Sequence, residues 1–155
     1  MPPTPVKVVR SRFSALVYKL MPYMIATTHP AHKEYVVEEQ KSKRKMWEKD
    51  LKAFADEYDF RSIAFEDEAR DSSVAADALV ATVAFSAKLQ RVGLGERPSE
   101  EMKELSVFKR DSPTGPWLYS DATIKNPFKN MQTAVKPQQR AVKTLAKGVP
   151  KGNQG

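Results

Sequence analysis

The two histidines are the side chains whose spacing first suggests chemistry in this 155-residue sequence. His29 and His32 stand three residues apart, and two imidazoles on one helix face can bind a metal ion. His29 precedes Pro30, however, which places it at an expected helix cap, and no third ligand is evident. The chain contains no cysteine, so thiolate metal sites and cysteine nucleophiles are excluded. The sequence therefore predicts no metal site.

A run of carboxylates and a pair of glycines are the other candidates for chemistry. Carboxylates cluster between residues 66 and 71, but acid–base catalysis needs two of them in different environments, and nothing nearby builds such a pocket. The run from Gly93 to Pro98 resembles half of a glycine-rich phosphate loop. It follows an expected helix and lacks the later Lys-Ser/Thr pair, so it is more typical of a helix end. We therefore predict no catalytic residue, no cofactor and no enzymatic activity.

The charge of the chain is divided into blocks. The net charge is +7, but residues 1–46 carry nine basic and three acidic side chains, and residues 106–155 carry nine and two. Between them, residues 47–71 carry nine acidic and four basic side chains. The basic ends are expected to contact an anionic surface, although charge runs are often merely solvated. The side chains expected to make these contacts are Lys41, Lys43, Arg44, Lys45, Lys125, Lys129, Arg140, Lys143 and Lys147.

Residues 1–29 form a basic segment without an acidic residue, since the first one is Glu34. Apolar residues recur every three or four positions from Val6 to Leu20, which predicts an amphipathic helix. This combination is typical of a mitochondrial presequence, here one that is not cleaved. Two other interpretations stay open: a basic helix that packs on a neighbour, and a helix that lies on an anionic membrane surface.

The remaining pattern predicts an all-α protein. Helices are expected at about 5–21, 30–58 and 73–92, with a short fourth over 97–105. The second contains no glycine or proline after Pro30, and the third is apolar on nearly every side, as in a buried helix. No apolar run reaches the roughly 18 residues of a membrane span. We expect a small open bundle over 30–105.

Residues 106–155 are expected to form an extended basic arm, because they contain five prolines and lack apolar periodicity. Aromatic and apolar side chains of the arm and of the second helix are predicted to anchor the protein on partner subunits. These anchors are Trp47, Leu51, Phe54, Tyr58, Trp117, Tyr119 and Phe128.

Together these features predict a non-catalytic accessory subunit of a large mitochondrial assembly, preferably a respiratory-chain complex or the ATP synthase. It would act as a scaffold in the matrix or on the matrix side of the inner membrane. The first alternative is a mitochondrial ribosomal protein whose basic ends contact rRNA. A third hypothesis is a protein that binds the microtubule or another cytoskeletal lattice.

Overall fold

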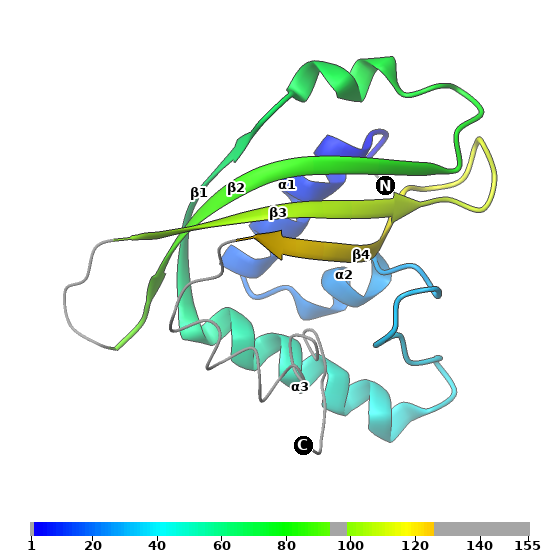
Figure 1. Ribbon diagram of the computed structural model, residues 1–155. Coiled ribbons are helices and arrows are strands. Elements are labelled where there is room, and N and C mark those ends of the chain that lie inside the picture. Colours follow the sequence, from blue (N-terminus) through cyan, green and yellow to red (C-terminus); the bar gives the residue numbers. More distant parts are fainter. Residues whose placement is uncertain (1, 94–98, 126–155) are drawn as a thin grey trace.

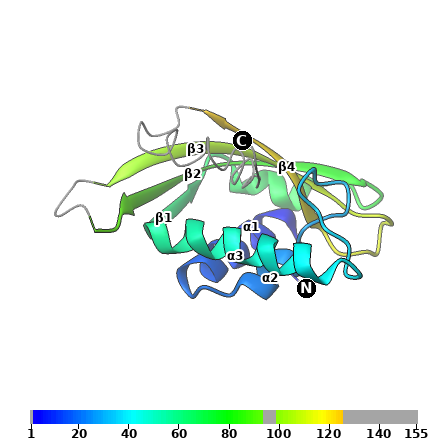
Figure 2. The same cartoon turned by 90° about the horizontal axis from the view of Figure 1, so that it is seen from below.

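The computed structural model describes residues 2–93 and 99–125 and shows an α+β fold. Four strands form one antiparallel sheet in the order β1-β2-β3-β4. The strands are β1 (Tyr58–Phe65), β2 (Val80–Arg91), β3 (Glu100–Lys109) and β4 (Leu118–Lys125). Three helices lie together on one face of this curved sheet (Figures 1 and 2).

The helices are α1 (Pro5–Val17), α2 (Met21–Ala26) and α3 (Lys41–Glu57), and a 3-10 turn, η1 (Glu68–Ser73), follows β1. The Thr4 side chain caps α1 by accepting from the backbone N–H of Lys7, and Pro5 occupies the first turn. Lys19, with a φ of 59°, ends the helix in a left-handed turn. The chain then reverses into α2.

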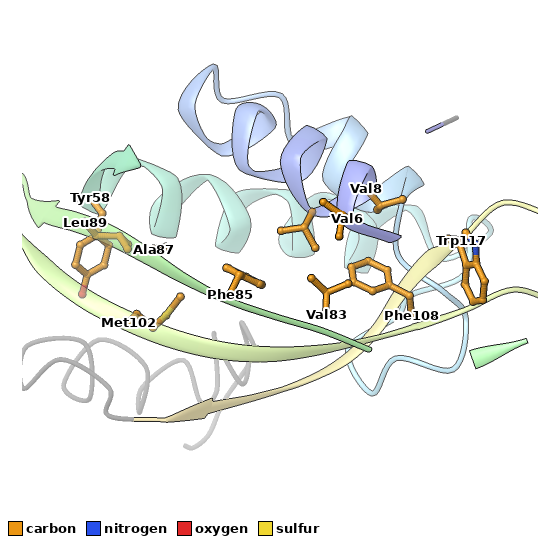
Figure 3. Close-up of a cluster of buried hydrophobic side chains, with 11 residues drawn as sticks. Val6, Val8, Tyr58, Val83, Phe85, Ala87, Leu89, Met102, Phe108 and Trp117 are labelled. Atoms are coloured by element: carbon orange, nitrogen blue, oxygen red, sulfur yellow. The ribbon is translucent and has the colours of Figure 1, made fainter. Parts of the chain in front are cut away.

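Side chains alternate along the central strands, as a sheet with one covered face requires. In β2, Val83, Phe85, Ala87 and Leu89 are buried. In β3, Met102, Ser106 and Phe108 are buried in the same way. Figure 3 shows Val83, Phe85 and Phe108 pointing from the sheet toward α1, and Val6 and Val8 of that helix belong to the same hydrophobic cluster.

The all-α prediction is wrong at the two segments expected to be helices over 73–92 and 97–105. Most of the first is β2 and the second contributes the start of β3. The alanines at positions such as 81, 84 and 87 make both faces of β2 look apolar, which hides the alternation of a strand. Pairing with β3 along ten positions decides the structure, and such pairing cannot be read from either segment alone.

The other boundaries also differ from those expected. The helix expected over 5–21 ends at Val17, a second helix, α2, begins at Met21, and the helix expected over 30–58 starts only at Lys41. The extended arm expected from residue 106 begins inside β3, and β4 pairs with β3 to complete the sheet. Phe128, Lys129, Arg140, Lys143 and Lys147 lie outside the described residues.

None of the helices in the described residues combines the length and the apolar character needed to cross a bilayer.

Candidate ligand-binding cavity

A cavity of about 210 Å³ lies between the sheet and the helices. The three α-helices and all four strands contribute to its wall, and most of the contributed side chains are apolar or aromatic. The apolar part of the wall consists of Val9, Phe13, Leu16, Met24, Trp47, Leu51, Phe54, Phe60, Ile63, Phe85, Ala87, Leu89, Met102, Phe108, Ala122 and Ile124.

A small set of polar side chains interrupts this apolar wall. Arg12 comes from α1, and Glu104 and Ser106 come from inward-facing positions of β3. Tyr119 comes from β4, and His32 comes from the segment between α2 and α3. An apolar cavity with a few convergent polar groups is the usual form of a small-molecule site.

Arg12 uses only one end of its guanidinium group within the protein. Nη1 donates to the Met24 carbonyl oxygen at 3.0 Å and to the hydroxyls of Thr27 and Thr28 at 2.7 and 3.4 Å. Nη2 and Nε have no hydrogen-bond partner among the described residues, and none of the ion pairs there includes Arg12. Burial lowers the pKa of Arg12, and the nearby Tyr119 and Glu104 act in the opposite direction.

The Glu104 carboxyl group is the acidic counterpart of Arg12 in the cavity. Oε2 accepts a hydrogen bond from the Ser106 hydroxyl at 2.5 Å. Burial raises the pKa of Glu104, while the Ser106 hydrogen bond and the charge of Arg12 act against this shift. Because no ion pair among the described residues joins Glu104 to Arg12, each group keeps hydrogen-bonding capacity toward the cavity.

Tyr119 forms a platform between Arg12 and His32. The Arg12 guanidinium carbon lies 4.4 Å from the centre of the Tyr119 ring, and the His32 ring centre lies 5.3 Å from it. Burial raises the pKa of the Tyr119 hydroxyl well above its ordinary value, so the phenol stays protonated. The backbone holds this platform in place, because Tyr119 N donates to the Thr27 carbonyl at 2.8 Å and His29 N donates to the Tyr119 carbonyl at 2.7 Å.

His32 is a neutral side chain at physiological pH. Burial lowers its pKa to about 4, and the charge of Arg12 acts in the same direction. Nδ1 accepts from the backbone N–H of Glu34 at 3.0 Å, so the neutral ring carries its proton on Nε2. The cavity therefore offers hydrogen-bond donors from Arg12 and His32 beside the acceptor oxygens of Glu104.

The six predicted partner anchors among the described residues lie in the cavity wall or in the hydrophobic core. Trp47, Leu51, Phe54 and Tyr119 line the cavity. Tyr58 and Trp117 are each 3% exposed and belong to the main hydrophobic core. The spacing of the α3 residues therefore marks the face that packs toward the sheet.

The described basic residues that were predicted to contact an anionic surface do not line the cavity. Lys41, Lys43 and Lys45 are exposed in the first turns of α3, and Lys125 is exposed at the end of β4. Arg44 lies between two rings, with its guanidinium carbon 5.7 Å from the ring centre of Tyr35 and also 5.7 Å from that of Trp47. Contact of these residues with an anion stays a prediction.

The other chemical candidates of the sequence have structural roles. The side chains of His29 and His32 have different partners, since His29 Nε2 lies 2.9 Å from Asp111 Oδ1. No cluster of three metal-ligating side chains occurs in residues 2–93 and 99–125. In the acidic run, Asp71 Oδ1 accepts from Val6 N at 3.0 Å, and Glu68 pairs with Arg10. This run therefore contacts the N-terminus of α1 and a basic side chain of that helix.

The polar residues of the cavity were missed because their signal depends on the correct secondary structure. Arg12 interrupts the apolar stripe of Val9, Phe13 and Leu16 on α1, which was a readable sign of a charged group facing inward. Glu104 stands between Met102 and Ser106 on the inward side of β3. That alternation has no meaning when the segment is assigned to a helix.

The comparisons with known proteins agree with this architecture. A family model described as the YchJ middle NTF2-like domain matches residues 4–122. Searches of curated proteins and of solved structures gave no match. The family match overturns the predicted mitochondrial accessory subunit, together with its ribosomal and cytoskeletal alternatives, because it assigns the chain to an α+β NTF2-like domain family instead. The chain, with its sheet, three covering helices and the cavity between them, belongs to the family of YchJ-like middle NTF2-like domains.

Proposed function

We propose that this domain binds a small organic molecule with an apolar body and at least one polar group. The observation that carries the proposal is Arg12, which lines an apolar cavity while its Nη2 and Nε atoms have no partner among the described residues. NTF2-like folds include both enzymes and non-enzymes, so the proposal rests on the cavity rather than on the family.

The size of the cavity supports a small ligand. An engineered apolar cavity of about 150 Å³ holds benzene, and 210 Å³ is larger than that. Six of the wall residues are phenylalanine or tryptophan, which favours a flat or aromatic body. We therefore expect a molecule of roughly ten non-hydrogen atoms.

The polar groups set the orientation of the ligand. The Nε and Nη2 atoms of Arg12 have no partner among the described residues, so a ligand group that accepts from them forms hydrogen bonds to a charged group, each worth about 1.5–3 kcal/mol. Donors from His32 and acceptors from Glu104 add a second and a third point of contact. Three such points distinguish one end of the ligand from the other.

Isothermal titration calorimetry with indole tests whether the cavity accepts a small neutral aromatic molecule. The full chain is compared with Ala122→Phe, which places a phenyl ring into the cavity from β4. Ala64→Phe is the matched control, since Ala64 is an exposed alanine of β1 outside the cavity wall. We expect one indole per chain, about tenfold weaker or unmeasurable binding in Ala122→Phe, and unchanged binding in Ala64→Phe.

Thermal unfolding of both variants confirms that each is folded before binding is compared. Equal indole affinity in folded Ala122→Phe and in the unchanged chain would contradict the proposal, because it would place the binding site outside the cavity. Absence of binding to the unchanged chain, both of indole and of the small aromatic carboxylate phenylacetate, would contradict it as well.

A further inference from the structure

We propose that the ligand of this cavity is a small carboxylic acid with an aromatic or aliphatic body, bound as an anion by Arg12 with a proton held between the ligand and Glu104. This inference deepens the proposed function and rests on it. It concerns the chemical class of the ligand and the proton that accompanies it.

The first argument is the geometry of Arg12. Its Nη1 atom is occupied by the carbonyl of Met24 and the hydroxyls of Thr27 and Thr28. The atoms left are Nε and Nη2, which form one side of the planar guanidinium group. That side presents two parallel N–H bonds, which match the two oxygens of a carboxylate.

The second argument is the position of Glu104. Its Oε2 atom accepts from Ser106, and its other oxygen has no hydrogen-bond partner among the described residues. The charge of Arg12 acts on Glu104, yet the two groups do not form an ion pair. A ligand group bound at the free side of Arg12 therefore has the Glu104 carboxyl in the same cavity.

Charge balance then requires a proton. If Glu104 and a bound carboxylate were both ionised, two anions would share one cation in an apolar cavity, which is strongly unfavourable. With one proton between them, the protonated carboxyl donates to the other and the site as a whole is neutral. Burial raises the pKa of Glu104 already in the free protein, and a bound anion raises it further.

Tyr119, His32, Asp121 and Lys33 do not replace Glu104 in this role. The tyrosine and the histidine are neutral, since burial raises the pKa of Tyr119 and lowers that of His32 to about 4. Asp121 and Lys33 are exposed, so solvent screens their charges. The walls from α3, β1 and β2 contribute only uncharged side chains. The titratable and charged groups facing Glu104 are Arg12, His32, Lys33, Glu34, Tyr119 and Asp121.

A carboxylate fits better than a phosphate. A phosphate monoester carries nearly two negative charges at neutral pH, which Arg12 alone does not balance beside Glu104. The flat carboxylate also matches one side of the guanidinium without the third oxygen that a phosphate would press into the apolar wall.

The test is the pH dependence of phenylacetate binding, measured by calorimetry on the full chain between about pH 5.5 and pH 8.5. Phenylacetate is ionised throughout this range, and phenylacetamide is its neutral counterpart of nearly the same shape. We expect the dissociation constant of phenylacetate to rise by about tenfold per pH unit at the alkaline end of the range, because binding takes up one proton. The dissociation constant of phenylacetamide should change less than about twofold.

The variant Glu104→Gln tests whether the proton taken up on binding is held by Glu104. Its amide donates a hydrogen bond at every pH, as the protonated carboxyl does, so phenylacetate affinity should become independent of pH. At about pH 8.5 this variant should bind phenylacetate more tightly than the unchanged chain. Glu101→Gln is the matched control: Glu101 is exposed on the same strand, and its loss should leave the pH profile unchanged.

The inference is overturned if phenylacetate binds with the same affinity at every pH, or if Glu104→Gln keeps the pH dependence of the unchanged chain. Indole binding without phenylacetate binding also overturns it, while the proposed function stands. If neither compound binds, the proposed function fails together with this inference.

Discussion

Arg12 is a half-buried cation with hydrogen-bond partners for Nη1 and none among the described residues for Nε and Nη2. Its Nη1 atom holds the C-terminal end of α2, and the side chain lines the cavity. Burial of a charge in this way costs free energy of folding, which is the usual consequence of placing a binding group in an apolar site.

We expect Arg12→Met to raise the free energy of unfolding by up to about 1 kcal/mol, because the gain from an apolar side chain with no charge to desolvate is largely offset by the lost hydrogen bonds of Nη1. The acceptors that Arg12 leaves keep other partners: Thr28 Oγ1 donates to the Met24 carbonyl at 2.7 Å, and Thr27 Oγ1 donates to the Tyr23 carbonyl at 2.8 Å. Urea unfolding measures the effect. Arg10→Met on the exposed side of α1 is the control and should change stability by less than about 1 kcal/mol. A large loss of stability in Arg12→Met would contradict this and show that the hydrogen bonds of Arg12 to α2 stabilise the fold.

The lowered pKa of His32 predicts that the free energy of unfolding depends on pH in the acid range. This pKa is about 4 in the folded protein, against an ordinary value of 6.5. Between these two values the His32 ring is therefore protonated in the unfolded chain and neutral in the folded one. The free energy of unfolding should therefore fall by up to about 1.4 kcal/mol per pH unit as the pH drops from 6.5 toward 4. Urea unfolding at several pH values measures this slope.

The variant His32→Gln separates this contribution from that of Glu104, whose raised pKa destabilises the fold in the opposite direction, as the pH rises. The slope between pH 6.5 and 4 should be smaller in His32→Gln than in the unchanged chain. Equal slopes would show that the His32 ring is protonated without cost in the folded state.

At the scale of elements, α3 closes the cavity with its apolar face. Trp47 is 8% exposed, and its ring centre lies 5.8 Å from that of Tyr35. Leu51 and Phe54 lie on the same face of the helix and also line the cavity. The helix then passes directly into β1 at Tyr58. The position of α3 is thus tied to the sheet through the chain as well as through packing.

Trp47→Ala should lower the free energy of unfolding by about 3–5 kcal/mol, because it removes a buried ring and enlarges the cavity. Met46→Ala, one residue away on the same helix and 64% exposed, should change it by less than about 0.5 kcal/mol. Thermal or urea unfolding of the two variants makes the comparison. Similar stabilities of the two would indicate that α3 does not pack on the sheet as described.

The elements also show how far the sequence alone leads. Local signals predict helix positions: Thr4 and Pro5 mark the start of α1, and the spacing of Trp47, Leu51 and Phe54 marks the inner face of α3. The strands could not be found in this way, because the alanine-rich β2 satisfies the helical and the strand period alike. Glu104 became visible as a site residue, and Tyr119 as its neighbour in a cavity, only once β3 and β4 were placed side by side.

At the scale of the whole molecule, part of the charge division is balanced internally. The acidic segment around η1 contacts the basic N-terminal helix, since Asp71 accepts from Val6 N and Glu68 pairs with Arg10. A carboxylate at a helix N-terminus is favourable because the helix dipole is positive there. The basic and acidic blocks therefore reflect contacts within one domain as well as an exposed surface. The mitochondrial localisation inferred from the N-terminal segment stays a prediction.

The central claim is that the cavity takes up a small molecule, and methyl NMR during an indole titration tests it most directly. We predict saturable shifts for methyl groups of the cavity wall, such as those of Leu51, Ile63, Leu89 and Ile124. The methyl groups of the exposed Val17, Val37 and Val80 should not move. Shifts confined to the exposed set, or no shift in the cavity wall at a saturating concentration, would contradict the account.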